Sequence, residues 1–204
     1  MRPETGNNIS VTENKVSIQL PLGGHSFSVD MLPDDAAVAG REVEFSVLTP
    51  RTTLVPREAY DESACEAYLR VAGLALQEDE TAVASDTSQQ CVAVMAIDKE
   101  CLKAIRERFG ESARFTSPLC GVQKYSDATV WLYRTCGLLY IKVYKSKLRF
   151  AEVIEAPGEA DVIQLLHDLE KPLAIKEFAI RCFGDDASRL RKALRRYYPV
   201  VLCE

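Results

Sequence analysis

A pair of glycines, Gly23 and Gly24, lies between two short apolar runs in the stretch LPLGGHSFS. Glycine-rich turns that follow a strand can hold phosphate groups on their backbone amides, and they can also simply close a hairpin. If the two glycines form a two-residue hairpin loop, Ile18 faces Val29 on an apolar face and Gln19 faces Ser28 on a polar one. Hairpin geometry alone therefore accounts for the glycines, and the phosphate-binding alternative needs further residues.

Histidines and cysteines are the other side chains that could carry chemistry. The histidines are His25 and His167, and none of the seven cysteines forms a C-x-x-C pair. Ligands scattered in this way do not predict a zinc site, and an odd number of cysteines argues against a disulfide framework. We expect reduced structural cysteines, with a catalytic thiol as the alternative. The sequence also contains no G-x-S-x-G elbow and no Walker loop, so it predicts no catalytic residue.

Acidic residues are absent from the stretches that would start each half of the fold. The predicted strands at 16–22 and 129–134 contain no carboxylate. Asp98 and the pair Asp185 and Asp186 each precede a predicted helix, where aspartate serves as an N-cap. We therefore predict no metal site, because two-metal chemistry needs clustered carboxylates.

The composition is that of a globular protein without a strong charge bias. The chain has 204 residues, 47% of them hydrophobic and 27% charged, with a net charge of −5. This acidity gives no global basic footprint for nucleic acid. No apolar run is long enough for a membrane span, and the first ten residues contain no apolar signal region. We expect a cytoplasmic protein.

Hydrophobic periodicity predicts two halves that repeat one order of elements. Each half has three meandering strands, then a helix, a strand, a helix and a strand. Predicted segments in the first half are a loose tail at 1–14, strands at 16–22, 25–29 and 42–48, a helix from Pro56 to Val71, a loop at 77–90, a buried strand at 91–97, a helix from Asp98 to Gly110 and a strand at 113–119. Those in the second half are strands at 129–144 joined by a tight turn, a strand at 147–155, a helix at 156–172, a strand at 176–183, a helix that buries Ala187, Leu190, Leu194 and Tyr197, and a strand at 199–203.

The predicted fold class is therefore α/β with mixed sheets, in two β-β-β-α-β-α-β lobes at 15–125 and 126–204. This doubled order resembles the ribonuclease H-like fold as duplicated in the actin-like ATPase superfamily. CVAVMAIDKECLKAIRERFGESARFTSPL is similar to the strand–helix–strand unit of its bacterial pilus-assembly and type II secretion members, and VWLYRTCGLLYIKVYKSKLRFAEVIEAPGEADV is similar to their second-lobe meander. The whole chain also resembles an uncharacterised bacterial family of this superfamily.

The resemblance implies where a nucleotide would bind. ATP-handling members carry an acidic residue at the end of the first strand of each lobe, followed by a glycine-containing turn that holds phosphate. Here Pro21 and Leu22 stand in place of the first acidic residue, and Arg134, Thr135 and Cys136 in place of the second. The positions of Gly23, Gly24, Cys136 and Gly137 are therefore identified as degenerate phosphate loops.

Because both acidic residues are missing, we expect a non-catalytic protein without a cofactor. The related secretion and pilus proteins are cytoplasmic assembly platforms, so the resemblance implies a scaffold with a protein partner. One alternative is an ATPase or kinase-like enzyme with non-standard motifs. A second is nucleic-acid binding through the basic last helix, which the net acidity does not favour.

Two surfaces are candidates for the partner. With Cys136 and Gly137 as the turn, Tyr133 faces Tyr140 and Trp131 faces Lys142, and Tyr144 lies further along the same sheet face. Such an aromatic face with an interleaved lysine is typical of binding surfaces, although a covering helix would bury it. The last helix carries Arg191 and Arg195 among its cations, which complement the helix dipole or bind an anionic partner. Strand addition at a sheet edge is a further possibility.

Overall fold

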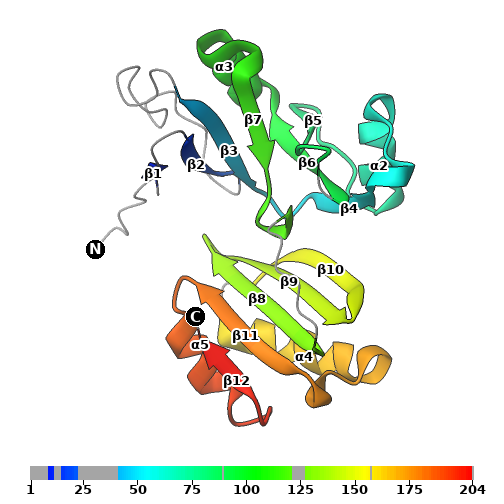
Figure 1. The fold of residues 1–204 in the computed structure, drawn as a ribbon, viewed down its shortest axis with the longest axis vertical. Coiled ribbons are helices and arrows are strands. Elements are labelled where there is room, and N and C mark those ends of the chain that lie inside the picture. Colours follow the sequence, from blue (N-terminus) through cyan, green and yellow to red (C-terminus); the bar gives the residue numbers. More distant parts are fainter. Residues whose placement is uncertain are drawn as a thin grey trace. The chain divides into compact units, whose positions relative to one another are not determined.

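A computed structural model describes residues 9–11, 15–22, 41–88, 90–120, 127–156 and 158–203. The chain divides into two compact units, Met1–Cys120 and Gly121–Glu204, and each has its own sheets and helices (Figure 1). The predicted hairpin turn at Gly23 and Gly24 and the strand predicted at 25–29 lie outside the described residues.

The described residues of the first unit form two sheets and two α-helices. One sheet has the order β1-β2-β3-β7, and the other has the order β4-β6-β5. The elements are β1 (Ile9–Val11), β2 (Lys15–Pro21), β3 (Glu42–Leu48), β4 (Thr52–Pro56), α2 (Cys65–Val71), β5 (Glu80–Ala84), β6 (Cys91–Asp98), α3 (Lys99–Phe109) and β7 (Ala113–Thr116), with 3₁₀ turns at Arg57–Ala59, Glu62–Ala64, Gly110–Ser112 and Pro118–Cys120.

The strand β6 is buried on both faces, which explains its continuous apolar run. Ala93, Met95 and Ile97 join the core that contains β2, β3 and α3. Val94 and Ala96 face the other way and pack with Leu69 of α2. The prediction of a buried strand here is confirmed, since β6 lies between β4 and β5.

The helix α3 begins and ends where its sequence predicts. The Asp98 carboxylate accepts a hydrogen bond from the backbone N–H of Cys101 at 2.8 Å, which is the N-cap contact. Gly110 ends the helix with a φ of 59°, a backbone conformation that glycine adopts without steric cost.

Two predictions for the first unit are wrong, one for a strand and one for a helix. The segment at 77–90 was expected to be a loop, but Glu80–Ala84 forms β5 along one edge of β6, and Arg51 forms an ion pair with Glu80. The helix predicted from Pro56 is α-helical only over Cys65–Val71, because the chain makes two 3₁₀ turns first.

The pairing predicted for Ile18 is also wrong. Ile18 lies opposite Ile9 on one side and Phe45 on the other, so no place remains for Val29. The strand β1 falls inside the segment that was expected to be a loose tail. The strands β2 and β3 pair directly and in parallel.

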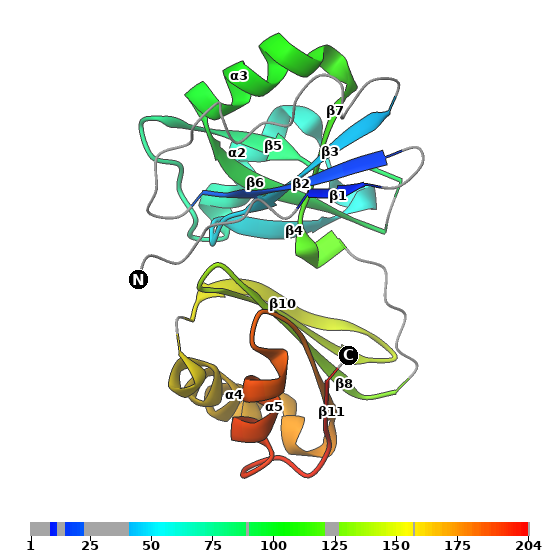
Figure 2. The same ribbon diagram turned by 90° about the vertical axis from the view of Figure 1, so that its left-hand side faces the viewer.

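In the second unit, the residues that the structure describes form one five-stranded mixed sheet of order β10-β9-β8-β11-β12 with two α-helices. Its elements follow the predicted order: β8 (Thr129–Thr135), β9 (Leu138–Lys145), β10 (Lys147–Glu155), α4 (Glu159–Leu173), a 3₁₀ turn at Ile175–Glu177, β11 (Ala179–Gly184), α5 (Ala187–Leu194) and β12 (Val201–Cys203). Figure 2 shows α4 and α5 on the same side of this sheet.

Both helices contribute to one core on that side. Leu166 of α4 and Leu190 of α5 pack with Val130, Leu132 and their neighbours on the sheet. Tyr197 was predicted to share the buried face of α5, but its side chain is 57% exposed. The reason is that α5 ends at Leu194 and the chain turns, so that Tyr198 enters the core instead.

In the part of the chain that the structure describes, no helix is long and apolar enough to cross a membrane.

Candidate functional site

The candidate site lies where the parallel strands β8 and β11 end at the same edge of the second sheet. Ligands of open α/β sheets bind beyond the carboxyl ends of such strands. The β8–β9 turn consists of Cys136 and Gly137, with φ values of 49° and 75°. These left-handed values are those of a tight hairpin turn, so the predicted turn is confirmed.

A carboxylate reaches this turn from a distant part of the sequence. Asp185 follows β11, and its Oδ2 accepts a hydrogen bond from the backbone N–H of Cys136 at 3.2 Å. The backbone N–H of Asp185 donates to the carbonyl oxygen of Arg134 at 2.7 Å. The carbonyl oxygen of Gly137 accepts from the N–H of Ala156 at 2.9 Å. The turn is therefore fixed by contacts to β11 and to the segment before α4.

The position of Asp185 depends on its neighbour Gly184. This glycine has a φ of 81°, and a Cβ atom there would lie 2.2 Å from the carbonyl oxygen of Arg134. Only a residue without a side chain allows the two strand ends to approach so closely. The predicted N-cap role is not the one observed, because Asp186 occupies the N-cap position of α5 without a side-chain cap bond.

A second carboxylate links the turn region to both helices. Glu159, the first residue of α4, lies 2.8 Å from Nε of Arg189 and 3.7 Å from a guanidinium nitrogen of Arg134. The side chain of Arg134 is mostly buried and that of Arg189 is mostly exposed. One carboxylate thus neutralises arginines from β8 and α5. Within the described ranges, no group of three or more His, Cys, Asp or Glu side chains could hold a metal ion.

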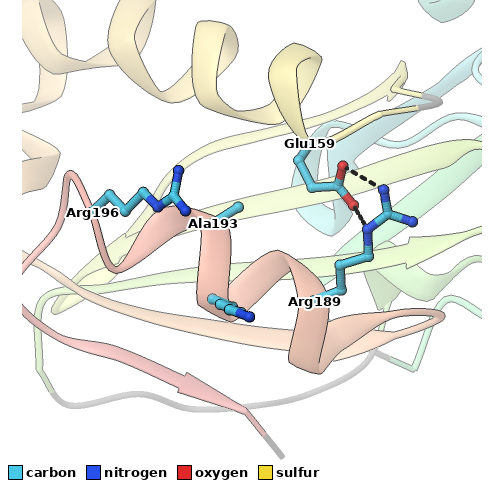
Figure 3. A pocket seen from close by; sticks show the side chains of 5 residues that line it. Glu159, Arg189, Ala193 and Arg196 are labelled. Carbon is cyan, nitrogen blue, oxygen red and sulfur yellow. Dashed lines mark hydrogen bonds and ion pairs between the residues drawn. The ribbon is translucent and has the colours of Figure 1, made fainter.

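Beside this network is a groove of about 210 Å³ between the start of α4 and the exposed side of α5. Figure 3 shows Arg189 pointing toward Glu159, with Ala193 further along α5 and Arg196 in the turn that follows it. The lining residues are Glu159, Arg189, Lys192, Ala193 and Arg196. Arg191 and Arg195, the cations predicted as candidates for a partner, do not line this groove. Arg191 is half-buried on α5, and Arg195 is exposed at its C-cap. Positions 189, 192 and 196 are spaced three and four residues apart, which places their side chains on one face of a helix. This pattern in the sequence could have indicated the groove.

The predicted aromatic face exists, although much of it is buried. Trp131 pairs with Lys142 and Tyr133 with Tyr140, as the register predicted. Lys142 is 1% exposed, and its Nζ lies 4.0 Å from the centroid of the Trp131 ring. Trp131 and Tyr140 are buried as well, while Tyr133 and Tyr144 are half-buried. The helices α4 and α5 pack on the opposite face. A partner-binding role for these residues stays a prediction.

In the first unit, the described residues at the corresponding turn are Pro21 and Leu22. Pro21 ends β2, and the N–H of Leu22 donates to the carbonyl oxygen of Leu48 at 2.9 Å. Proline has no N–H, so neither residue offers a free backbone donor to a ligand.

All seven cysteines are free thiols. Burial, together with the smaller effect of the nearby Asp98 carboxylate, raises the pKa of Cys101 to about 12. Burial also raises the pKa of Cys182 to about 12. These two thiols are therefore poor nucleophiles near neutral pH.

Comparisons with known proteins identify the fold. A family described as Protein of unknown function (DUF3822) matches residues 35–129. A protein from Bacteroides thetaiotaomicron, described as having an actin-like ATPase fold and unknown function, matches with 19% identity and a TM-score of 0.67, over 80% of this chain and 68% of that chain. No protein with a curated description matches the sequence.

Two further solved structures are similar at lower scores. The cytoplasmic domain of EpsL, an inner membrane component of the type II secretion system of Vibrio cholerae, has 10% identity and a TM-score of 0.47, covering 83% of this chain and 82% of that chain. The PilM–PilN type IV pilus biogenesis complex has 11% identity and a TM-score of 0.45, covering 82% and 70%. The resemblance predicted from the sequence is confirmed at the level of the fold. The chain has the actin-like ATPase fold, with mixed α/β sheets.

Proposed function

We propose that this chain is a non-catalytic actin-fold module that acts in the cytoplasm through contacts with a protein partner. The observation that carries the proposal is the hydrogen bond from the Cys136 N–H to the Asp185 carboxylate. A phosphate-binding turn needs backbone amides that point at the ligand. Here such an amide already has an acceptor, and that acceptor is negatively charged.

Electrostatics add to the geometric argument. Two like charges about 4 Å apart repel by roughly 1 to 4 kcal/mol at the effective dielectric constants of water and of a protein surface. A phosphate at the turn would meet the Asp185 carboxylate at about that range. The nearby Arg134 offers little compensation, because Glu159 already lies 3.7 Å from its guanidinium group. The residues present therefore do not fit Mg²⁺–ATP at this turn.

The protein partner is what the sequence resemblance to pilus-assembly and secretion platforms implies. A module of this kind needs a rigid unit that presents a fixed surface. The ties from the turn to Asp185 and Ala156, and from Glu159 to Arg189, supply such rigidity in the second unit. The resemblance implies that an ATPase would hold its ligand at the β8–β9 turn. In this proposal, protein groups take the place of that ligand.

Calorimetric titration of the full chain with Mg²⁺–ATP tests the proposal. We expect no binding tighter than a dissociation constant of about 1 mM. The variant Asp185→Ala frees the Cys136 amide and removes the charge, so it should gain measurable affinity for phosphate. Asp186→Ala is the matched control, because it removes the same charge next door but no side-chain contact to the turn.

Micromolar Mg²⁺-dependent binding by the wild-type chain would contradict the proposal. If Asp185→Ala abolished such binding, Asp185 would instead organise a metal ion, and the enzyme alternative would be favoured.

A further inference from the structure

We propose that the groove between α4 and α5 binds acidic side chains of a protein partner. This inference rests on the proposed function, since it names the chemistry of the partner. The groove is lined by Glu159, Arg189, Lys192, Ala193 and Arg196, with a volume of about 210 Å³ (Figure 3).

The shape of the groove follows from the spacing of its residues. Positions 189, 192, 193 and 196 recur at intervals of three and four residues, so they share one side of α5 and of the turn that follows it. Ala193 is the short side chain among long ones, and it leaves the space between the cations open. Glu159 closes the end of the groove from the start of α4.

The charge of the groove is positive even after its internal ion pairs are counted. Glu159 is shared by Arg189, at 2.8 Å, and Arg134, at 3.7 Å. Among the described residues, no acidic side chain pairs with Lys192 or Arg196. The chain as a whole carries a net charge of −5. A local excess of cations on an acidic molecule favours an anionic ligand at this place.

The orientation of Arg189 is set before any ligand arrives. Its Nε and a terminal nitrogen contact the two Glu159 oxygens at 2.8 and 3.3 Å (Figure 3). This paired geometry holds the guanidinium group at the mouth of the groove. Arg196 lies on the other side of Ala193, so a carboxylate between them would meet cations from two directions.

Size and total charge favour acidic side chains over larger anions. Cofactor-sized ligands need pockets of about 300 Å³ or more. A nucleic acid draws its affinity from many phosphate contacts, often about six to ten, whereas the groove offers three cations. The net acidity of the chain also repels a long polyanion. Carboxylates in contrast suit the arginine fork and need little space.

Fluorescence anisotropy with a labelled hexaglutamate peptide tests the inference. We expect saturable binding at low salt. Lys192→Gln/Arg196→Gln should weaken it by about tenfold or more, because each removed cation takes away a charge-assisted hydrogen bond to a carboxylate. The control is Lys171→Gln/Lys176→Gln, which removes the same charge from exposed positions of α4 and of the 3₁₀ turn that follows it, outside the groove. It should change affinity by less than about twofold.

A second variant guards against a general effect of charge on folding. Ala193→Glu places a competing carboxylate between the cations and should also abolish peptide binding, with thermal unfolding recorded for every variant. Equal losses in the groove pair and the control pair, or no binding at all, would overturn the inference.

A labelled single-stranded DNA is a further probe in the same anisotropy experiment. DNA that binds more tightly than the peptide, and is lost in the groove pair, would replace the acidic partner with a nucleic acid. Mg²⁺–ATP binding that the groove pair leaves unchanged would contradict the proposed function but not the groove.

Discussion

At the scale of single residues, the second unit depends on one close approach of backbone. Gly184 ends β11 beside the end of β8, and its neighbour Asp185 bonds to Arg134 and Cys136. The conformation of Gly184 and the contact of Asp185 therefore belong to one arrangement. A residue that forces the strand ends apart would lose both.

Gly184→Ala should destabilise the protein by about 3 kcal/mol or more, because strain at a special backbone position adds to a steric clash. The clash is with backbone, since the new Cβ would lie 2.2 Å from the Arg134 carbonyl oxygen. Gly137→Ala is the matched control: its φ is 75°, but no atom lies within 4 Å of the new Cβ. It should cost only about 1 kcal/mol, the usual penalty for a left-handed residue. Urea unfolding measures both, and equal costs would contradict the argument.

Residues differ in how far their roles can be predicted from sequence. Asp98 bonds three residues ahead, so local pattern was sufficient to predict its cap. Asp185 bonds to Cys136, 49 residues earlier, and no local pattern encodes that partner. The same limit applies to Glu159, whose partners lie on β8 and α5. The turn itself was predicted, but the contact of Asp185 with it and the ion pairs of Glu159 were not.

At the scale of elements, α4 ends in a conformation that its sequence does not favour. Ala174 is the C-cap residue, with φ 50° and ψ 45° in the left-handed region. Its N–H donates to the carbonyl oxygen of Glu170 at 2.9 Å. Glycine is the residue most often found at such helix ends, because it has no Cβ to clash there.

Ala174→Gly should therefore stabilise the protein, by about 0.5 to 1 kcal/mol. Ala160→Gly makes the same chemical change at an exposed position in the first turn of α4, where the backbone is helical. There it should destabilise by up to about 1 kcal/mol, since glycine is a poor helix former. Thermal unfolding of the two variants should give shifts of opposite sign. Shifts of the same sign would show that the cap conformation does not control the effect.

Elements were predictable where their own burial pattern is strong. The strand β6 and the helix α4 have long apolar patterns that indicate their structure without reference to neighbours. The strand β5 is short and mostly half-buried, and it exists because β6 offers it an edge. The 3₁₀ turns before α2 replace the first part of the helix that was predicted from Pro56 to Val71.

At the scale of the whole molecule, each unit has a core of its own. The core of the second unit draws every member from residues 128–203, and those of the first unit draw theirs from residues 16–120. The predicted lobes at 15–125 and 126–204 stay a proposal. The two compact units of the structure meet in the sequence between Cys120 and Gly121. An independent core is the physical requirement for a segment that folds alone.

The fragment Gly121–Glu204 should therefore unfold in one cooperative transition when it is expressed alone. Its sheet pairs five strands, and α4 and α5 cover one face with buried leucines. Leu166→Ala in the fragment should lower the free energy of unfolding by about 2 to 5 kcal/mol, because it opens a cavity under α4. Val71→Ala in the full chain is the contrasting change, since Val71 is 87% exposed and should cost almost nothing. Circular dichroism during urea unfolding measures these transitions. A fragment with helical signal but no cooperative transition would mean that the core of the second unit does not suffice for its fold.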